Sequence, residues 1–293
     1  MSSRLIMKSM IGFYITLFFL YLFGPLIVMS ITAFNTPRYP QAVPFEAFTL
    51  NWFVELWNHR SMMEGLRNSV VIGLGVVALA VPTGLAAAVV MNQIYPKARG
   101  LFYLVTVSPV LTPGVIIGIS TVIFWKDLLS MTDITRATFY NGTMLTIFGQ
   151  SSFISAYCLL IIMARLQRFD RTQEEAALDL GATHPQVFWQ ILLPFLKPAL
   201  ISAAVIGFLS SFENYNTTTF AILADKTLVT VLAGEVRQGT TPALSALAVV
   251  IIGISLIGAL GYEIAKRREE ARASMQKQQA RLAERAEESG QTA

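Results

Sequence analysis

Six long apolar segments constrain the fold of this chain more than any other feature. A helix needs about 20 apolar residues to cross the hydrocarbon core of a bilayer. Lipid offers no partner for backbone N–H and C=O groups, so a spanning segment must be a helix or part of a closed barrel. A barrel would show short alternating strands, whereas these segments are long and continuous. The sequence therefore predicts an all-α integral membrane protein with six transmembrane helices, at residues 11–34, 67–91, 101–125, 147–166, 198–222 and 243–265.

The charge content supports a membrane protein. Of 293 residues, 54% are hydrophobic and only 14% are charged, whereas a soluble domain carries about 25% charged residues. The formal net charge of +4 comes from basic residues between the apolar runs, not from a basic face that would suit nucleic acid. Arg4 and Lys8 precede the first apolar segment, but that segment is longer than a signal-peptide core and no clear cleavage site follows. We expect it to be retained as the first span.

The distribution of Lys and Arg predicts the orientation. With the N-terminus in the cytoplasm, fifteen of the 22 basic residues fall on the cytoplasmic side and seven on the other. The positive-inside rule therefore places both termini in the cytoplasm. The predicted organisation is a transmembrane domain over residues 1–266, with a cytoplasmic loop at 167–197, and a charged cytoplasmic tail at 267–293.

Reactive side chains do not form a pattern typical of an enzyme. The single cysteine, Cys158, lies in an apolar run, and the two histidines, His59 and His184, are far apart in the sequence. No G-x-x-x-x-G-K-[ST] phosphate-binding loop occurs, and no metal-ligand or nucleophile–base spacing is present. We expect no catalytic residue, metal or cofactor in this chain, so an energy source must lie in a partner.

Small residues and prolines mark the second and third apolar segments. Ala80, Gly84 and Ala88 form a small-residue stripe, and Gly114 with Gly118 forms a GxxxG pair. Such faces let helices approach closely in lipid. Pro82, Pro109 and Pro113 are expected to kink their helices. These residues fit either a static bundle or one that opens and closes.

The stretch EEAALDLGATHPQVFWQILLP, residues 174–194, is too charged at its start to span a membrane. Asp170, or Thr172 in a capping box with Glu175, can begin a helix that Gly181 ends in a left-handed C-cap. Thr183 or His184 can then cap a second short helix. Two short helices joined at Gly181 would fit a groove on another protein. Glu175 could equally be only a capping acid.

A polar patch, SSFENYNTTTF, interrupts the fifth apolar segment. An acid in the hydrocarbon region costs at least ~2.5 kcal/mol, so it should face water or the bundle interior. The patch predicts a translocation path that attracts a cation. Its candidate residues are Ser210, Glu213, Asn214, Asn216 and Thr217, of which Ser210, Glu213 and Thr217 share one helical face. Alternatively, Glu213 pairs with a neighbouring helix as a structural contact or lies near the membrane surface.

A family resemblance adds to this interpretation. Glu175-Ala176-Ala177, Gly181 and Ile191-Leu192-Leu193-Pro194 match the spacing of a cytoplasmic signature. That signature resembles the EAA motif of permease subunits from binding-protein-dependent ABC importers. SFENYN and the later TPALSALAV resemble the second permease subunit of spermidine/putrescine-type systems. The resemblance implies a type I ABC importer permease fold. It also implies a coupling helix that docks on an ATPase, formed by Glu174, Glu175, Ala176, Ala177, Asp179, Leu180 and Gly181.

The same resemblance implies the partners and the location. They are a second permease subunit in a heterodimer, two ATP-binding cassette subunits that hold ATP and Mg, and an extracytoplasmic solute-binding protein. The chain would be a multi-pass protein of the bacterial cytoplasmic (inner) membrane. The expected solute is small and cationic, like a polyamine, with an amino-acid derivative or another small organic solute as the alternative. Two other classes stay open, a secondary transporter and a structural membrane subunit.

Overall fold

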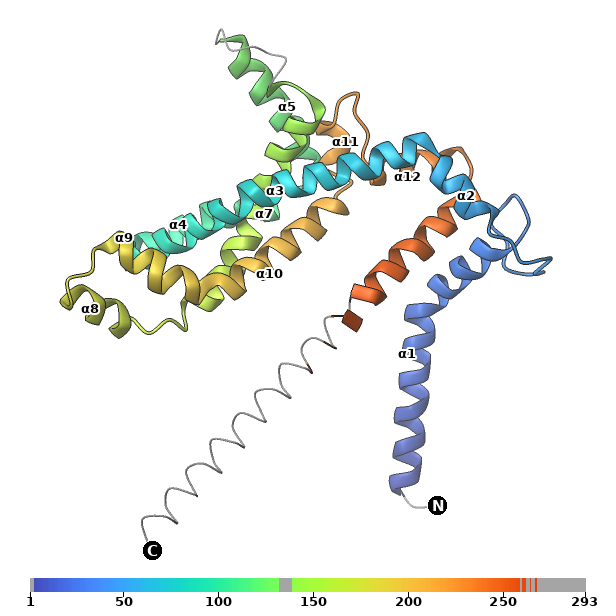
Figure 1. Cartoon of the computed structure of the whole chain (residues 1–293), viewed down its shortest axis with the longest axis horizontal. Coiled ribbons are helices and arrows are strands. Elements are labelled where there is room, and N and C mark those ends of the chain that lie inside the picture. Colours follow the sequence, from blue (N-terminus) through green and yellow to red (C-terminus); the bar gives the residue numbers. More distant parts are fainter. Residues whose placement is uncertain (1–2, 132–138, 259, 262–263, 265–266, 268–293) are drawn as a thin grey trace, which may run out of the picture. The chain divides into compact units, whose positions relative to one another are not determined.

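A computed structural model describes residues 3–131, 139–258, 260, 261, 264 and 267 (Figure 1). Within this part, regular secondary structure is helical, and the one β feature is an isolated antiparallel bridge between Asn35 and Phe48. The predicted all-α class is confirmed. The predicted tail at 267–293 lies outside the described residues, apart from Arg267.

The chain divides into two compact units, residues 1–57 with 239–293 and residues 58–238. The first unit contains α1 (Ser3–Phe34), most of α2 (Asn51–Asn58) and an apolar helix at Pro242–Gly258. Thr32 of α1 donates a hydrogen bond to the Ser245 hydroxyl at 2.9 Å, which ties α1 to this last helix. Trp52 donates from its indole nitrogen to the backbone oxygen of Asn35 at 2.6 Å, which fixes α2 against the end of α1.

The second unit is built around three packed helices, α3 (Arg60–Gln93), α7 (Gly142–Leu166) and α10 (Leu193–Phe212). Its core is apolar, with buried side chains that include Ile72, Val76, Ile154, Leu159, Ile162 and Leu196. Gly84 explains the close approach of α3 to α7, because a Cβ there would lie 2.6 Å from the Cβ of Cys158. Ala80, Gly84 and Ala88 are all buried, so the predicted small-residue stripe packs as expected.

The third apolar segment is not one continuous helix. Within the described residues, four helices are long and apolar enough to cross a membrane: Met7–Phe34, Arg60–Gln93, Gly142–Leu166 and His184–Phe212. Residues 101–125 are instead divided between α4 (Pro96–Leu111) and α5 (Gly114–Ser130), which pass the same test only as a pair and meet at a bend of 101°. Pro113 lacks an N–H and disfavours a helical conformation at Thr112, whose ψ is 131°. The single predicted span is therefore corrected to a broken pair.

The fifth apolar segment begins and ends earlier than the predicted 198–222. The continuous helix His184–Phe212 starts as α9 (His184–Val187), passes through the π-helical turn η1 (Phe188–Leu192) and continues as α10. The second short helix predicted in the cytoplasmic loop is thus the first turn of this long helix. Pro194 cannot donate a backbone hydrogen bond, and the wider turn before it lets the N–H of Leu193 bond to the Phe188 oxygen.

Smaller elements complete the second unit: α8 (Thr172–Asp179), α11 (Thr218–Ala221) and α12 (Leu228–Gln238). Figure 1 shows α8 beyond the ends of α4 and α10, at the end of this unit opposite to α11 and α12. The two regions singled out in the sequence therefore lie at different ends of one packed unit.

Candidate functional site

Asp170 holds the first residue of the loop helix α8 by two hydrogen bonds. One carboxylate oxygen of Asp170 accepts hydrogen bonds from the Thr172 N–H at 3.0 Å and from the Thr172 hydroxyl at 2.8 Å. These two bonds favour the ionised carboxylate and hold the pKa of Asp170 below its ordinary value. Thr172 is the first residue of the helix, not its cap. The N-cap position is Arg171, so neither of the predicted caps, Asp170 or Thr172, occupies it. In place of the predicted capping box, the Asp170 carboxylate bonds to Thr172.

Gly181 ends α8 in the predicted left-handed conformation. Its φ is +88°, its N–H bonds to the Leu178 oxygen at 2.9 Å, and the next N–H, of Ala182, bonds to the Ala177 oxygen at 3.0 Å. This pair of bonds is the Schellman motif. A Cβ at Gly181 would meet nothing within 4 Å, so the backbone conformation, not lack of space, favours glycine here.

Thr183 begins the next helix, as one of the two predicted caps. Its N–H donates to the side-chain oxygen of Gln186 at 2.7 Å, and its hydroxyl lies 3.0 Å from the same oxygen. The Gly181 turn and the Thr183 cap together fix the direction in which the chain leaves α8.

The surface of α8 presents small, acidic and apolar side chains together. No residue of α8 is buried. Glu174 and Ala177 are half-buried, whereas Glu175, Ala176, Asp179 and the following Leu180 are exposed. The Leu180 side chain, in the C-cap, is 89% exposed. The seven predicted coupling residues thus lie together in α8 and the turn that follows it, each exposed or half-buried.

An arginine and a phenylalanine side chain attach this loop to the helical core. Arg171 donates from Nη2 to the side-chain oxygen of Asn92 at 2.9 Å and to its backbone oxygen at 3.2 Å, at the end of α3. At the start of the loop, Phe169 packs against Phe195 of α10, and the Cζ of Arg165, in the last turn of α7, lies 4.3 Å from the centroid of the same Phe195 ring. The Phe169 and Phe195 ring centroids are 5.1 Å apart. A displacement of α8 would therefore pull on both α3 and α10.

The polar patch forms a break between α10 and α11. Gln150 of α7 is 1% exposed and spans this break. Its amide nitrogen donates to the Thr218 hydroxyl at 2.7 Å, and its amide oxygen accepts from the Ser211 hydroxyl. The Asn214 side chain accepts from the Thr217 N–H at 3.1 Å. The break is therefore a hydrogen-bonded structure that leaves Glu213 at the end of α10.

A cavity of about 330 Å³ opens at this break. It is lined by Phe153, Tyr157, Ser210, Glu213, Asn214, Tyr215 and Asn216. Four of the five predicted pathway residues are among them. Thr217 is the exception: it is fully buried, and its hydroxyl would lie 2.9 Å from a Cβ placed on Gly114 of α5. Because the helix ends at Phe212, the face expected to carry Ser210, Glu213 and Thr217 together does not continue.

Four residues of this site lie outside the predicted set: Phe153, Tyr157 and Tyr215 line the cavity, and Gln150 holds the break. Phe153, Tyr157 and Gln150 all come from α7. Their spacing was a usable signal, since positions 150, 153 and 157 share one face of a helix. Sequence alone did not show which other helix that face meets.

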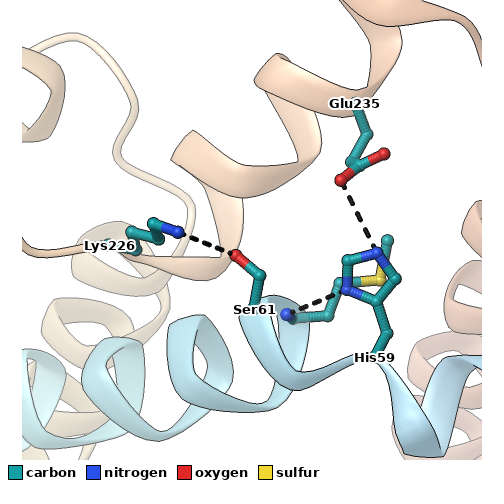
Figure 2. A network of polar contacts seen from close by, with 5 residues as sticks. His59, Ser61, Lys226 and Glu235 are labelled. Atoms are coloured by element: carbon teal, nitrogen blue, oxygen red, sulfur yellow. Dashed lines mark hydrogen bonds and ion pairs between the residues drawn. The ribbon is translucent and has the colours of Figure 1, made fainter.

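A second polar network lies around the start of α3 (Figure 2). The Nδ1 atom of His59 accepts from the Met62 N–H at 3.4 Å, and its Nε2 lies 3.6 Å from a carboxylate oxygen of Glu235 in α12. Lys226 donates to the Ser61 hydroxyl at 3.3 Å. These contacts hold α12 and the segment before it against α3. Within the described part of the chain, no group of three or more His, Cys, Asp or Glu residues is placed to hold a metal.

Comparison with known protein families identifies the class. A family profile described as "Binding-protein-dependent transport system inner membrane component" matches residues 80–270. The chain belongs to this family. It is therefore a multi-pass transport subunit of a bacterial inner membrane and not an enzyme. The matched range includes the α8 loop, the break at Glu213, the whole of α7 and α10, and the part of α3 from residue 80 onward.

Similar curated proteins are named as polyamine permeases. The chain is 29% identical over 259 residues to the putrescine transport system permease protein PotI of Escherichia coli (strain K12), covering 87% of this chain and 90% of that protein. It is 26% identical over 266 residues to the spermidine/putrescine transport system permease protein PotC of Haemophilus influenzae, covering 87% and 94%.

Solved structures share the fold. A chain of a bacterial ABC transporter involved in import of the acidic polysaccharide alginate matches with a TM-score of 0.67 at 19% identity, covering 90% of this chain and 95% of that one. A chain of the MetNI methionine ABC transporter, in inward-facing conformations, matches with a TM-score of 0.52 at 20% identity, covering 72% and 95%. At these identities the likeness shows the fold alone.

Proposed function

We propose that this chain is one permease subunit of an ATP-driven importer that carries a small organic cation, of the polyamine type, across the bacterial inner membrane. The observation that carries the proposal is the position of Glu213, a carboxylate at a hydrogen-bonded break in an apolar helix and on the wall of a polar cavity. The family membership and the names of the polyamine relatives support the same solute class.

The composition of the cavity favours an amine over an amino-acid derivative. The Glu213 carboxylate supplies a negative charge for an ammonium group, and Ser210 and Asn216 supply oxygen acceptors for its N–H groups. An amino acid would also need a cationic partner for its carboxylate. Neither Lys nor Arg is among the residues that line the cavity. A diamine therefore satisfies the site more completely.

The proposed membrane arrangement has six spans and both termini in the cytoplasm. The spans would be α1, α3, the broken pair α4 and α5, α7, the continuous helix His184–Phe212, and the helix that begins at Pro242. The length and hydropathy of four helices and of the bent pair support five of these. The orientation rests on the excess of Lys and Arg on the side of the α8 loop.

The proposed role of α8 is to couple the permease to an ATPase. Ala176, Ala177 and Leu180 offer small and apolar contacts, and Glu174, Glu175 and Asp179 offer charge to a basic rim. ATP and Mg would be held by two ATP-binding cassette subunits, and closure of these subunits would move α8. The contacts of Arg171 with Asn92 and of Phe169 with Phe195 would pass that movement to α3 and α10. A second, distinct permease subunit would complete the pathway, and an extracytoplasmic binding protein would deliver the solute.

The test of the pathway is Glu213→Gln in the complete transporter, with binding protein, both permeases and ATPases in proteoliposomes. We expect putrescine uptake to fall at least tenfold, while recovery of the complex and its ATPase content stay normal. Glu64→Gln is the matched control, because Glu64 is an exposed carboxylate of α3 that does not line the cavity. Unchanged uptake kinetics in Glu213→Gln would remove this residue from the pathway.

A further inference from the structure

The cavity at Glu213 has an aromatic side that its polar residues do not explain. Phe153 and Tyr157 of α7 line the same cavity as Glu213. Their ring centroids are 6.3 Å apart and the ring planes meet at 86°. One ring thus stands edge-on to the other, and the Tyr157 side chain is 38% exposed in this chain. The cavity therefore combines a carboxylate, amide and hydroxyl oxygens, and three aromatic rings, those of Phe153 and Tyr157 and that of Tyr215 beside Glu213.

We propose that Phe153 and Tyr157 determine specificity, forming with Glu213 a site for an alkylammonium group within the permease itself. The proposal rests on the proposed import of an organic cation and adds that the membrane subunit also selects its solute. An alkylammonium ion has a positive charge on a short apolar chain. The carboxylate neutralises the charge, the ring faces attract the cation through their quadrupoles, and the rings cover the methylene groups.

The register of α7 holds the rings and the carboxylate together. Gln150 lies three residues before Phe153 and seven before Tyr157, so these side chains lie on one face of the helix. Gln150 binds both sides of the break that carries Glu213, through Ser211 and Thr218. The same helix face therefore fixes the break and supplies the aromatic wall. This arrangement places the rings and Glu213 on the wall of one cavity.

The alternative role for these rings is packing against lipid or against a second permease subunit. That role needs only bulk and apolarity, which leucine supplies. Selection of a cation needs an aromatic face, which phenylalanine and tyrosine supply and leucine does not. Substitutions that keep or remove the ring therefore separate the two roles.

The experiment is equilibrium binding of radiolabelled putrescine to the purified permease–ATPase complex without its binding protein. We expect Phe153→Leu and Tyr157→Leu each to weaken binding by roughly 5- to 30-fold, as expected for loss of a desolvated cation–π contact. Tyr157→Phe and Phe153→Tyr should stay within about twofold of the parent complex, because each keeps its ring. In the parent complex, putrescine should be displaced by other alkylamines and not by 1,4-butanediol, which has the chain without the charge.

The matched control is Phe148→Leu. Phe148 is also on α7, but its ring stacks on Trp125 at a centroid distance of 4.5 Å and lines a different cavity. We expect Phe148→Leu to leave putrescine binding unchanged. Complex recovery and ATPase content serve as the folding check for every variant.

Two results would overturn the inference. One is that Phe153→Leu and Tyr157→Leu both bind putrescine as tightly as the parent complex does. The other is a parent complex that binds no putrescine at millimolar concentration. If the leucine variants bind normally while Glu213→Gln loses uptake, the pathway stands and aromatic selection fails. If the complete parent transporter takes up no polyamine, the proposed function itself fails.

Discussion

Gln150 of α7 donates a hydrogen bond to the hydroxyl of Thr218 at 2.7 Å, across the break that separates α10 from α11. The same side chain accepts from Ser211, so one buried amide holds both sides of the break. An unpaired polar group costs more in an apolar interior than in water, and this pairing is therefore a determinant of where the helix ends.

Gln150→Leu removes both bonds and leaves the hydroxyls of Ser211 and Thr218 without this partner. The Thr218 hydroxyl keeps its bond to the backbone oxygen of Asn214, but an unsatisfied buried Ser211 hydroxyl costs about 1–3 kcal/mol. We therefore expect a lower thermal stability of the complex together with weaker putrescine binding. Ser152→Ala is the control, since Ser152 on the same helix bonds only to the Gly149 oxygen within its own helix turn. A Gln150→Leu complex with parental stability and binding would show that the break forms without this residue.

Gly181→Asp tests the end of α8. The φ of +88° at this position costs roughly 1–2 kcal/mol for a residue with a side chain, and a new carboxylate enters a surface that we propose to be docked. We expect the subunit to reach the membrane, with reduced uptake and less ATPase retained on purification. Gly181→Asn should have a smaller effect, because asparagine tolerates the left-handed conformation. Normal uptake and normal ATPase recovery in Gly181→Asp would refute the coupling role of this turn.

Arg171→Ala tests transmission from α8 to α3. The Arg171 contact with Asn92 is exposed, and contacts of this kind contribute less than about 1 kcal/mol to stability. We therefore expect an intact complex that hydrolyses ATP at a normal rate but takes up several-fold less solute per ATP. The readout is the ratio of uptake to hydrolysis. An unchanged ratio would mean that α8 moves α3 by another contact.

Asp170 gives a prediction for pH. Its pKa is lowered by the two hydrogen bonds from Thr172, so its contribution to α8 is fully present above the ordinary aspartate pKa of about 3.9 and is lost as the pH falls through the lower folded pKa. Amide hydrogen exchange at the start of α8 should be equally protected at pH 6 and pH 8. Asp170→Ala should lose this protection at both pH values, and Asp170→Asn, which keeps an acceptor oxygen, should lose less. If amide exchange at the start of α8 in Asp170→Ala is as protected as in the parent chain, the two Asp170–Thr172 hydrogen bonds do not stabilise this helix end.

The sequence was sufficient for features that depend on local chemistry. Gly181 predicted a left-handed helix end and Thr183 a helix start, and both are present because a glycine or a hydroxyl acts on neighbouring backbone groups. The all-helical class followed from the length of the apolar segments. The prediction of a separate second short helix after Gly181 was wrong, because a π-helical turn before Pro194 lets that helix continue into α10.

Features that depend on distant partners were not predictable in the same way. Apolar residues resume at Phe220 after the polar stretch 213–219, so composition extended the fifth span to residue 222. The break there depends on Gln150, which lies 61 residues before Ser211. Thr217 was placed with Glu213 by helical spacing, yet it packs against Gly114 because the helix has already ended. Phe153 and Tyr157 became recognisable as site residues only once α7 was seen beside the break.

The most direct test of the central claim is solute uptake into proteoliposomes that contain this chain, its permease partner and the ATPases, with the binding protein outside. We predict that radiolabelled putrescine enters only when ATP is present in the lumen, on the side of the membrane that carries the ATPases. An imposed proton or sodium gradient should not replace ATP. Uptake driven by an ion gradient without ATP would identify a secondary transporter. A complex that moves no solute at all under ATP would identify a structural subunit, and either result would contradict the account.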